Sequence, residues 1–498
     1  DEGETVCIYG DYDVDGVTSV ALLRAILMAY DLDPQYFIPV RSREGYGLSE
    51  AGIKRCLCEC ADPPSLLITV DCGTSSVKEV DMLNSLGIDV IILDHHEAGP
   101  LGRPDAAAVV NAKIEENSPY TYLCSAGVVF KLAHALLKER KLKTFDLKLY
   151  LDLVAVATVA DIVPLVAENR ILVRHGLGRL AHSRHTGLKT LTEIAGIRPS
   201  DSVNHAGFLN AAHVGFRIGP RINASGRIQN GKEAVDLLTE KDFSIALEKA
   251  NQINQYNETR KDLDKTMTEE ANQIVADLEG LAERRSIVLY NEDWHKGVIG
   301  IVASRLTEIY YRPAVVLTRT DDMATGSARS VSGFDVYKAI EYCRDLLENF
   351  GGHTYAAGLS MKVENVPAFT KRFEEFVSQN ILPEQTSAVI NIDAEIDFRD
   401  ISPKFFNDLK KFNPYGPDNP KPIFCTHNVY DYGTSKVVGR DQEHIKLELV
   451  DNKSIAFGQS SHVRFIKTKR SFDICYTIEE NTHKRGEVQL QIEDIQPN

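Results

Sequence analysis

Hydrophobic and polar positions follow two alternating patterns in the first 190 residues. Short apolar runs predict strands near residues 6–10, 35–40, 66–70 and 89–93, and helical spacing predicts helices near residues 17–30, 48–60 and 75–86. Strands that alternate with helices favour a mostly parallel sheet covered by helices on both faces. Helical stretches near 125–140 and 146–160 complete a predicted α/β domain spanning residues 1–190.

Residues 191–285 predict a linker and a long connecting helix. Apolar residues between Ala234 and Leu278 recur at helical spacing with no intervening proline, as in one long helix or two in tandem. Strand and helix patterns alternate again in residues 286–385, with strands expected at 286–290 and 314–318 and helices at 297–310 and 334–349. This pattern predicts a second α/β domain.

The final segment, residues 388–498, has a β pattern. Short alternating runs separated by polar turns lie at 389–392, 429–432, 445–449, 454–457, 471–476 and 487–492. Such spacing is typical of a small β-barrel, although periodicity alone leaves other β-folds open.

Acidic residues gather at the ends of the predicted elements. Asp11, Asp13 and Asp15 follow the first strand, where alternation along an extended chain would place them on one side. Asp71 follows another strand, the triplet 94–96 (Asp-His-His) follows a third, and Asp161 closes an apolar stretch. Since α/β sheets build their sites at the carboxyl ends of strands, we expect these groups to lie together.

Crowded carboxylates repel one another unless a cation lies among them. Oxygen and imidazole ligands without a thiolate suit Mn²⁺ or Mg²⁺ better than a structural zinc ion, and this ligand set is large enough for two ions with one bridging carboxylate. A single aspartate after a strand is usually a helix cap or a turn residue. Four separate clusters nevertheless favour a metal site.

The acidic motifs, in this order, resemble those of the DHH phosphoesterase superfamily, whose members hydrolyse phosphate esters or anhydrides with two divalent metals. Segments 219–227 (GPRINASGR), 294–305 (WHKGVIGIVASR), 326–330 (GSARS) and 351–358 (GGHTYAAG) resemble signatures of its RecJ branch, bacterial exonucleases that degrade single-stranded DNA from the 5′ end. The resemblance implies a DHH catalytic domain, a DHH-associated domain that binds substrate and an oligonucleotide-binding (OB) barrel for the three regions described above.

The resemblance also implies residue roles in the catalytic domain. His96 would contact the phosphate or protonate the leaving oxygen, and Asp94 would orient a histidine. The bridging carboxylate would be Asp71, and Asp11 would be a ligand or lie beside one. The implied metal ligands for two Mn²⁺ or Mg²⁺ ions are Asp11, Asp13, Asp15, Asp71, His95 and Asp161.

Basic residues in the RecJ-like motifs are expected to bind the substrate phosphates. Arg221, Arg227 and Arg329 carry guanidinium forks suited to phosphate, although an arginine beside glycine can also form a surface ion pair. Arg329, Ser327 and Arg221 are expected to form a pocket for a 5′-terminal phosphate. Ser327 and His353 are expected in glycine-flanked loops that complete this pocket, with loop anchoring as the alternative for His353.

These features favour a metal-dependent 5′ to 3′ exonuclease that releases mononucleotides from single-stranded DNA, preferably 5′-phosphorylated, in repair and recombination. A DHH nuclease for very short oligonucleotides or a cyclic-dinucleotide phosphodiesterase is disfavoured by the β-rich final segment. A non-catalytic replication scaffold would be expected to lose metal ligands. A pyrophosphatase-like member is disfavoured because Tyr9 occupies that branch's histidine position. A monomer that works with a single-strand-binding protein and a helicase is the expected assembly.

The net charge of -15 is unusual for a DNA-binding enzyme. Basic residues must therefore be concentrated locally. The final segment offers Lys436, Arg440, His444 and Lys446, together with the basic run 467–470, as either a strand-binding surface or a solvated loop. Trp294, the only tryptophan, would either stack on a base or pack at a domain interface.

The remaining composition is typical of a globular protein, with 43% hydrophobic and 26% charged residues. No apolar segment reaches membrane-spanning length and no signal peptide pattern opens the chain, so a cytoplasmic location is expected. The chain starts at Asp1, close to the first strand, which suggests a missing N-terminal segment. Cys56, Cys58 and Cys60 lack the spacing of a zinc knuckle and predict helix packing.

Overall fold

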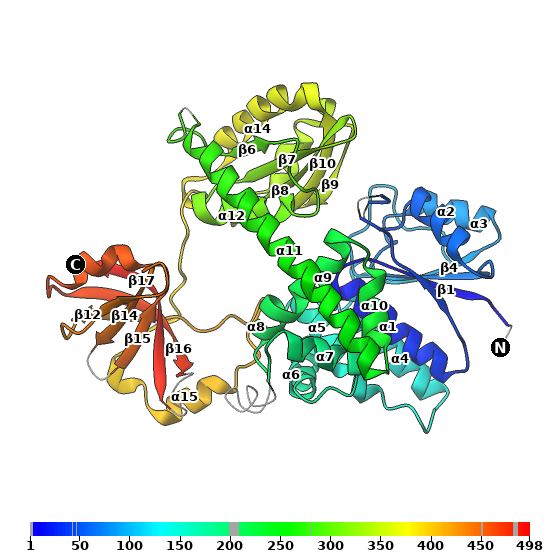
Figure 1. Cartoon of the computed structure of the whole chain (residues 1–498), viewed down its shortest axis with the longest axis horizontal. Helices are drawn as coiled ribbons and strands as arrows, with labels where there is room; N and C mark the ends of the chain where they lie inside the picture. The colour runs from blue at the N-terminus through cyan, green and yellow to red at the C-terminus, as the bar shows by residue number, and fades with distance from the viewer. Residues whose placement is uncertain are drawn as a thin grey trace.

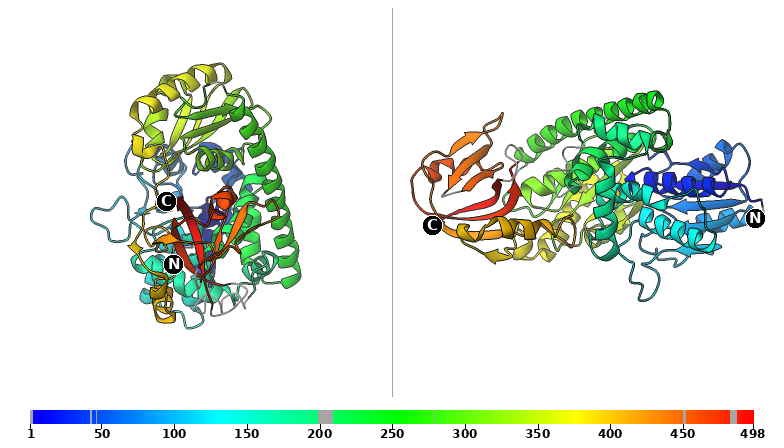
Figure 2. Two further views of the ribbon diagram at one scale, coloured as in Figure 1. Left: turned by 90° about the vertical axis from the view of Figure 1, so that its left-hand side faces the viewer. Right: turned by 90° about the horizontal axis from the view of Figure 1, so that it is seen from below.

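The computed structural model describes residues 3–41, 43–45, 47–198, 209–278, 280–449, 452–481 and 487–498. The chain forms three lobes around a central opening: an N-terminal lobe (residues 5–239), a middle lobe (287–380) and a C-terminal lobe (394–498) (Figure 1). The two termini lie at opposite ends of the molecule (Figure 2). Residues 199–208 of the predicted connecting segment lie outside the described residues.

The N-terminal lobe is built on a five-stranded sheet with the order β2-β1-β3-β4-β5, in which every neighbouring pair is parallel. The strands are β1 (Val6–Gly10), β2 (Gln35–Phe37), β3 (Leu66–Val70), β4 (Asp89–Leu93) and β5 (Ala108–Val110). All carboxyl ends therefore lie at one edge, as the sequence predicted. The short edge strand β5 was not predicted.

Helices cover both faces of this sheet, and strand alternation explains why. Ile8 points into a core with α1, α4 and α5, whereas its neighbours Cys7 and Tyr9 point into a second core with α2 and α3. The helices are α1 (Val14–Ala29), α2 (Glu50–Glu59), α3 (Val77–Ser85), α4 (Ser125–Glu139) and α5 (Leu151–Ala160).

A helical layer completes the N-terminal lobe and leads to the middle lobe. It contains α6 (Ala167–Leu180), α7 (Thr186–Ile194), α8 (Ala211–His213), a π-helical turn (Val214–Ile218), α9 (Gly219–Ile228) and α10 (Lys232–Thr239). The predicted connecting helix is two helices in tandem, because Asp242 caps the start of α11 (Phe243–Ala276) and its side chain accepts the amides of Ser244 and Ile245. The 34-residue α11 runs from the N-terminal lobe to the middle lobe (Figure 1).

The middle lobe has a mixed five-stranded sheet with the order β6-β7-β8-β10-β9. Only β6 and β7 are parallel; the other neighbours are antiparallel. Its strands are β6 (Ile287–Tyr290), β7 (Ala314–Thr320), β8 (Met323–Arg329), β9 (Asn349–His353) and β10 (Ala356–Lys362), and its helices are α12 (Ile299–Tyr310), α13 (Val336–Glu341) and α14 (Val366–Asn380).

The helix predicted at 334–349 is too long. Helix α13 ends at Glu341, a short 3₁₀ turn covers Arg344–Leu346, and β9 begins at Asn349. Phe350 of β9 pairs with Leu359 of β10 and packs against the buried core of this lobe. Tertiary pairing therefore overrides the helical pattern at this point.

The C-terminal lobe is a seven-stranded sheet with the order β11-β12-β16-β17-β15-β14-β13. The strands are β11 (Ala394–Glu395), β12 (Phe424–Val429), β13 (Lys436–Val438), β14 (His444–Leu449), β15 (Asn452–Ala456), β16 (Phe472–Glu480) and β17 (Val488–Pro497), with helices α15 (Pro403–Lys410) and α16 (Val463–Ile466). The strand predicted at 389–392 is wrong: Val389 and Ile392 are exposed and lie outside any strand.

The predicted barrel is not closed by a strand ladder in the described residues, since no pairing joins β11 or β12 to β13. Strands β12 and β13 are consecutive along the chain and lie toward opposite sides of the sheet. Between them, the Tyr432 amide donates to the Glu448 carbonyl, and the Glu448 amide donates to Ser435 Oγ. The connecting segment thus bends across from one side of the sheet to the other.

The C-terminal lobe also contacts the N-terminal lobe. The Leu165 amide donates to the Pro417 carbonyl at 2.8 Å, and Arg170 and Arg174 of α6 donate to the carbonyls of Lys411 and Asn413. An extended segment links it to the middle lobe (Figure 1). The three lobes therefore close a ring. Within the described part of the chain, no helix combines the length and apolarity that crossing a membrane requires.

Candidate active site

The acidic motif 11–15 lies at the point where β1 turns into α1. Asp11 directly follows the strand, Asp13 is the N-cap of α1, and Asp15 lies in its first turn. The interpretation that these residues alternate on one side of an extended chain is therefore wrong, since the turn and helix bring them together instead. One oxygen of Asp13 accepts the amides of Asp15 and Gly16, so this residue also performs the ordinary capping role.

Three other elements bring their acidic and imidazole groups to the same place. His95 follows β4, and its Nε2 lies 3.3 Å from Asp71 Oδ1, 3.5 Å from Asp161 Oδ2 and 3.7 Å from Asp15 Oδ2. Asp161 is the C-cap of helix α5, not the end of a strand. The helix end serves the same purpose because α5 packs beside α1, whose first turn carries Asp15.

The ligand atoms form three overlapping sets, each within 4.8 Å: Asp11, Asp13 and Asp71; Asp71, His95 and His96; and Asp15, His95 and Asp161. Burial raises the pKa of Asp15 to about 6, with the charge of Asp13 acting in the same direction. Burial likewise holds the pKa values of Asp11, Asp71 and Asp161 well above the usual range. The site thus gathers carboxyl groups away from water, where their ionised forms are unfavourable unless cations neutralise them.

Several of these buried atoms have no hydrogen-bond partner within the described residues: both Asp11 oxygens, Asp161 Oδ2 and both nitrogens of His95. Burial and the neighbouring His96 lower the pKa of His95 to about 3, which keeps its imidazole neutral and able to donate a lone pair. Unpartnered buried carboxylates beside a neutral imidazole fit divalent cations with oxygen and nitrogen ligands.

Asp94 contacts both histidines of the Asp-His-His triplet. Its Oδ1 lies 2.7 Å from His96 Nδ1 and accepts the His95 amide, while its Oδ2 accepts the Thr74 amide. Burial opposes protonation of His96, but the hydrogen bond and charge of Asp94 raise the pKa of His96 above its ordinary value. The His96 side chain is 41% exposed, against 9% for His95, so the two histidines differ in environment.

The middle lobe supplies a second, basic half of the site. Arg329 is partly buried and donates to Ser327 Oγ and the Ala328 carbonyl, both at 2.8 Å. Ser327 lies within β8 and His353 ends β9, so the prediction that both lie in loops is wrong. The nearby glycines allow close strand pairing, as where Gly358 lies opposite Ser327.

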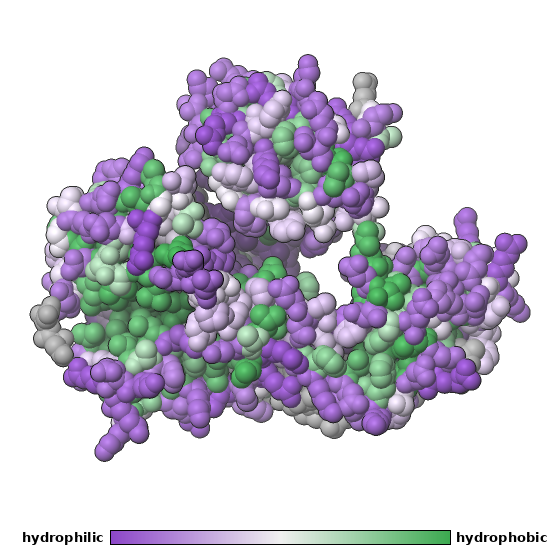
Figure 3. Space-filling view, turned by 180° about the vertical axis from the view of Figure 1, so that it is seen from behind, coloured by the Kyte–Doolittle hydropathy of each residue, from purple (hydrophilic) through white to green (hydrophobic). Residues whose placement is uncertain are grey.

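Arg227 links this basic half to the N-terminal lobe. Its Nη1 donates to the Gly297 carbonyl, and burial, reinforced by Arg41, lowers the pKa of Arg227 to about 10. Arg329 also interacts electrostatically with Arg41, and His353 with Arg329 and His96. The acidic edge and the basic residues of the middle lobe therefore face each other. Figure 3 shows a recess with hydrophilic walls between these two lobes.

Arg221 occupies a different environment. Its Nε donates to Asn254 of α11 and its Nη1 to the Arg217 carbonyl, and its charged neighbours include Glu258. Trp294 is 4% exposed and donates from Nε1 to Glu270 of α11. The tryptophan thus packs where the connecting helix meets the middle lobe, which is the packing alternative rather than base stacking.

Sequence reasoning missed several residues of the site. Arg41 follows β2, and Asn111 follows β5 and donates to Thr74 Oγ1 and the His96 carbonyl. The Ser125 and Ala126 amides, at the start of α4, donate to the two Asp15 oxygens. Arg41 and Asn111 lie at strand ends, the same signal that identified Asp71, but β5 itself was not recognised.

The C-terminal lobe presents basic and aromatic side chains. Lys436 and Lys446 lie opposite each other on β13 and β14, and the basic run at residues 467–470 includes exposed Lys467. His444 contacts the Phe457 ring edge to face, and Phe457 is 50% exposed. Tyr430 and Tyr432 are also exposed. His444 is paired with Glu443, which offsets part of the positive charge.

Comparison with known proteins finds family models that match three separate parts of the chain. Family models match as "DHH family, N-terminal domain" at residues 5–158, "DHHA1 domain" at 283–379 and "RecJ OB domain" at 392–494. The chain is 38% identical over 454 residues to the single-stranded-DNA-specific exonuclease RecJ of Bacillus subtilis, covering 91% of this chain and 55% of that protein. It is 32% identical over 520 residues to RecJ of Salmonella typhimurium, covering 100% and 88%.

A solved structure is also similar over the whole chain. RecJ of Thermus thermophilus in complex with Mn²⁺ matches with a TM-score of 0.83 at 29% identity, covering 100% of this chain and 69% of that one, and a structure with Mg²⁺ matches at 0.79. The chain thus spans 55% to 88% of the length of the relatives named here.

Proposed function

Because the chain belongs to the RecJ family of single-stranded-DNA-specific exonucleases, we propose that it hydrolyses single-stranded DNA from the 5′ end and releases mononucleotides. The observation that carries this proposal is the opposition of two charged surfaces. Buried carboxylates and His95 line one side, and Arg227, Arg329 and His353 line the other. A phosphodiester between them would meet metal ligands and phosphate-binding groups together.

The catalytic half would hold two divalent cations, Mn²⁺ or Mg²⁺, through Asp11, Asp13, Asp15, Asp71, His95 and Asp161. Asp71 belongs to two of the ligand sets, which supports it as the bridging carboxylate. When bound, such a pair of ions supplies a nucleophile near neutral pH and stabilises charge on the reacting phosphate. Asp15 is held in place by the amides of α4, and Asp71 accepts from Ser125 Oγ.

His96 is suited to contact the phosphate or to donate a proton to the leaving oxygen. Its Nδ1 faces Asp94, and we assign Nε2 as the nitrogen that would meet substrate. The raised pKa of His96 favours the protonated form that either role needs. Asp94 is then a positioning residue, because it contacts His96 and two backbone amides of its own turn.

Direction of digestion would follow from a 5′-terminal phosphate pocket at Arg329, Ser327 and His353. The fixed contacts of Arg329 hold its guanidinium beside Ser327. We place Arg227 between this pocket and the metal ligands and assign Arg221 to the path of the strand along α11. Strand polarity follows if the pocket accepts a chain end and the metal ligands receive the adjacent bond.

The C-terminal lobe would bind the rest of the strand. Exposed Tyr430, Tyr432 and Phe457 offer stacking surfaces, and Lys436 and Lys446 offer contacts to the DNA backbone.

The domain boundaries 1–190, 191–285, 286–385 and 388–498 belong to this proposal. So do a monomeric state, cooperation with a single-strand-binding protein and a helicase, and a cytoplasmic location, where the DNA substrate is found.

Digestion of end-labelled strands tests the proposal. Single-stranded and duplex DNA and RNA, labelled at either end, are incubated with Mn²⁺, Mg²⁺ or chelator. We expect immediate mononucleotide release from 5′-labelled single-stranded DNA, late release from the 3′ label and no digestion in chelator. Early release of the 3′ label would refute the polarity, and equal digestion of RNA would refute the substrate class.

A further inference from the structure

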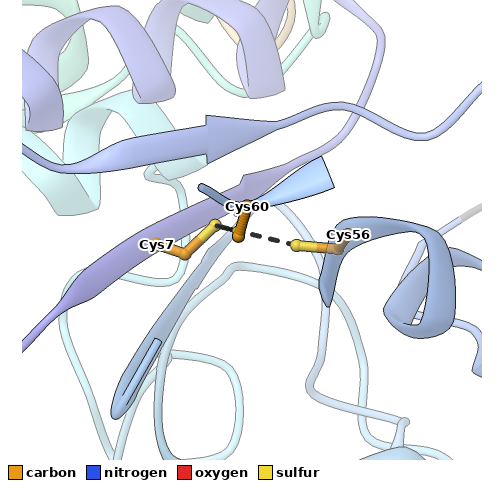
Figure 4. A group of neighbouring side chains, drawn as sticks. All are labelled: Cys7, Cys56 and Cys60. Carbon is orange, nitrogen blue, oxygen red and sulfur yellow. Dashed lines mark hydrogen bonds between the residues drawn. The ribbon is translucent and has the colours of Figure 1, made fainter. Parts of the chain in front are cut away.

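A cluster of three cysteines lies in the N-terminal lobe, apart from the catalytic carboxylates. Cys7 is on β1, Cys56 is in α2 and Cys60 is the C-cap of α2, and their sulfur atoms converge (Figure 4). Cys7 Sγ lies 3.7 Å from both Cys56 Sγ and Cys60 Sγ, and the three sulfur atoms all lie within 4.8 Å of one another. Cys58 is exposed and outside the cluster.

The element pattern explains this convergence. Residues four apart on a helix share a face, so Cys56 and Cys60 both point toward the sheet. Cys7 alternates with Ile8 along β1 and points into the same core. The cysteine spacing predicted helix packing, and the structure adds a third sulfur from a distant strand.

We propose that Cys7, Cys56 and Cys60 form a second metal site that binds a thiophilic divalent cation of the zinc class. In tetrahedral thiolate coordination with metal–sulfur bonds of about 2.3 Å, neighbouring sulfur atoms lie about 3.8 Å apart. The 3.7 Å separations of Cys7 Sγ from the other two sulfur atoms match that geometry. A disulfide would need two of the sulfur atoms to approach to about 2.05 Å and would leave the third unpaired.

The charges around the cluster suit a bound cation. Lys232 interacts electrostatically with Cys7 and Cys60 and lines the same cavity as Cys56 and Cys60. Three thiolates and a divalent cation leave one negative charge, which Lys232 at the start of α10 would offset. The ammonium therefore compensates the site without occupying a coordination position.

An entry path is also present. Cys56 and Cys60 line a cavity of about 280 Å³ together with Arg24, Asp33 and Lys232. Glu59 lines it too, but its carboxylate is paired with Arg55 at 2.7 Å. The fourth coordination position would thus face the solvent in this cavity, and the ion would exchange with solution.

Cadmium titration of the whole chain tests the site. The protein is held in excess Mn²⁺ to occupy the catalytic ligands, and Cd²⁺ is added while the sulfur-to-metal charge-transfer absorption is recorded in the ultraviolet. Oxygen and imidazole ligands do not give this band. We expect it to saturate near one Cd²⁺ per chain in the wild type and in the matched control Cys58→Ser, and to be lost in Cys60→Ser and Cys60→Ala.

Zinc binding gives an independent readout. Zn²⁺ added in the same Mn²⁺ background should raise the unfolding temperature of the wild type and Cys58→Ser but not of Cys60→Ser, whose substitution lies at a partly exposed helix end. Absence of the charge-transfer band in the wild type, or an equal band in Cys60→Ser, would overturn the proposal. So would loss of two hydrogens, located by mass on peptides that contain Cys7, Cys56 or Cys60, after mild peroxide treatment in saturating Zn²⁺, because it would identify a disulfide within the cluster instead.

Discussion

At the scale of single residues, Asp71 combines an unusual backbone with a functional side chain. Its φ is 62°, in the left-handed region, and its buried carboxylate belongs to two ligand sets. Asparagine tolerates this backbone better than alanine and keeps the size of the side chain. We expect Asp71→Asn to lower turnover by more than the roughly 10- to 100-fold typical of residues that only orient a ligand. Turnover at saturating Mn²⁺ measures this.

The same substitution should stabilise the metal-free protein. The pKa of Asp71 in the folded protein is raised well above the ordinary aspartate value of 3.8. Above pH 3.8 the folded protein therefore binds more protons than the unfolded chain, so this carboxyl increasingly destabilises the fold as the pH rises. In chelator, the free energy of unfolding of Asp71→Asn should therefore exceed that of the wild type at neutral pH, and this difference should disappear in acid. Asp89→Asn, at an exposed position, is the control. Normal turnover, or no gain in chelator, would contradict these assignments.

The prediction about the 5′ end of the DNA strand concerns Arg329. Losing a charge-assisted phosphate contact costs on the order of 1.5 to 3 kcal/mol, roughly a tenfold to hundredfold fall in kcat/KM. Arg329→Ala should show this loss on 5′-phosphorylated strands and a smaller one on 5′-hydroxyl strands. Arg221→Ala, whose guanidinium binds Asn254, should affect both substrates alike. If Arg329→Ala lowered kcat/KM equally for 5′-phosphorylated and 5′-hydroxyl substrates, Arg329 would contact another part of the DNA strand.

The acidic residues could be predicted individually because each follows a recognisable element. Their exact arrangement could not, since Asp13 and Asp15 are placed by a helix turn and Asp161 by the end of α5. Arg41 is one of 56 lysine and arginine residues, and only folding brings it beside Arg227 and Arg329. Charge complementarity across two lobes leaves no local signal in the sequence.

At the scale of elements, prediction succeeded where burial sets a simple period. Strands β1, β3 and β4 match their predicted ranges because both faces are buried and the runs are mostly apolar, with exposed Asp89 only at the start of β4. Strand β8 (MATGSAR) and strand β9 (NFGGH) contain glycine and polar residues in place of such a run. They form strands because β10 pairs with both, which is a tertiary cause.

One glycine shows how closely these elements approach. A Cβ on Gly300 of α12 would lie 3.0 Å from both Arg329 Nη2 and Ser327 Oγ. Gly300→Ala should therefore shift the phosphate pocket by a few tenths of an ångström and raise KM for 5′-phosphorylated strands, while kcat and metal affinity stay near normal. Gly351→Ala on β9, where no atom lies within 4 Å of the added carbon, is the matched control. An unchanged KM would mean that α12 does not influence substrate binding.

At the scale of the whole molecule, the arrangement of the three lobes was beyond sequence reasoning. The order of domains along the chain was readable from the change in periodicity, but the ring depends on a small contact. Residues 411–417 lie against α6 and Leu165 through hydrogen bonds to three carbonyl groups. Polar backbone contacts of this kind leave no apolar pattern, so their partners could not be inferred.

The contact between Leu165 and Gly416 provides the test of whether this ring matters. A Cβ on Gly416 would lie 2.6 Å from Leu165 Cδ1, so Gly416→Val should separate the C-terminal lobe from the N-terminal lobe without touching a metal ligand. If that lobe holds the strand in register with the active site, binding of long strands should weaken by up to about 100-fold, as expected when a tethered second site is lost.

Cleavage of a bound short oligonucleotide should change little in this variant, because every proposed metal ligand lies in the N-terminal lobe. Deletion of residues 388–498 should cause the largest loss of affinity for long strands, because it removes the whole C-terminal lobe. Adding Leu165→Ala to Gly416→Val removes the clashing side chain and should restore part of the affinity, since the two positions are in contact. Binding to labelled strands of increasing length measures all three proteins. If Gly416→Val and the deletion both bound long strands as the wild type does, the C-terminal lobe would act on partner proteins instead of on DNA.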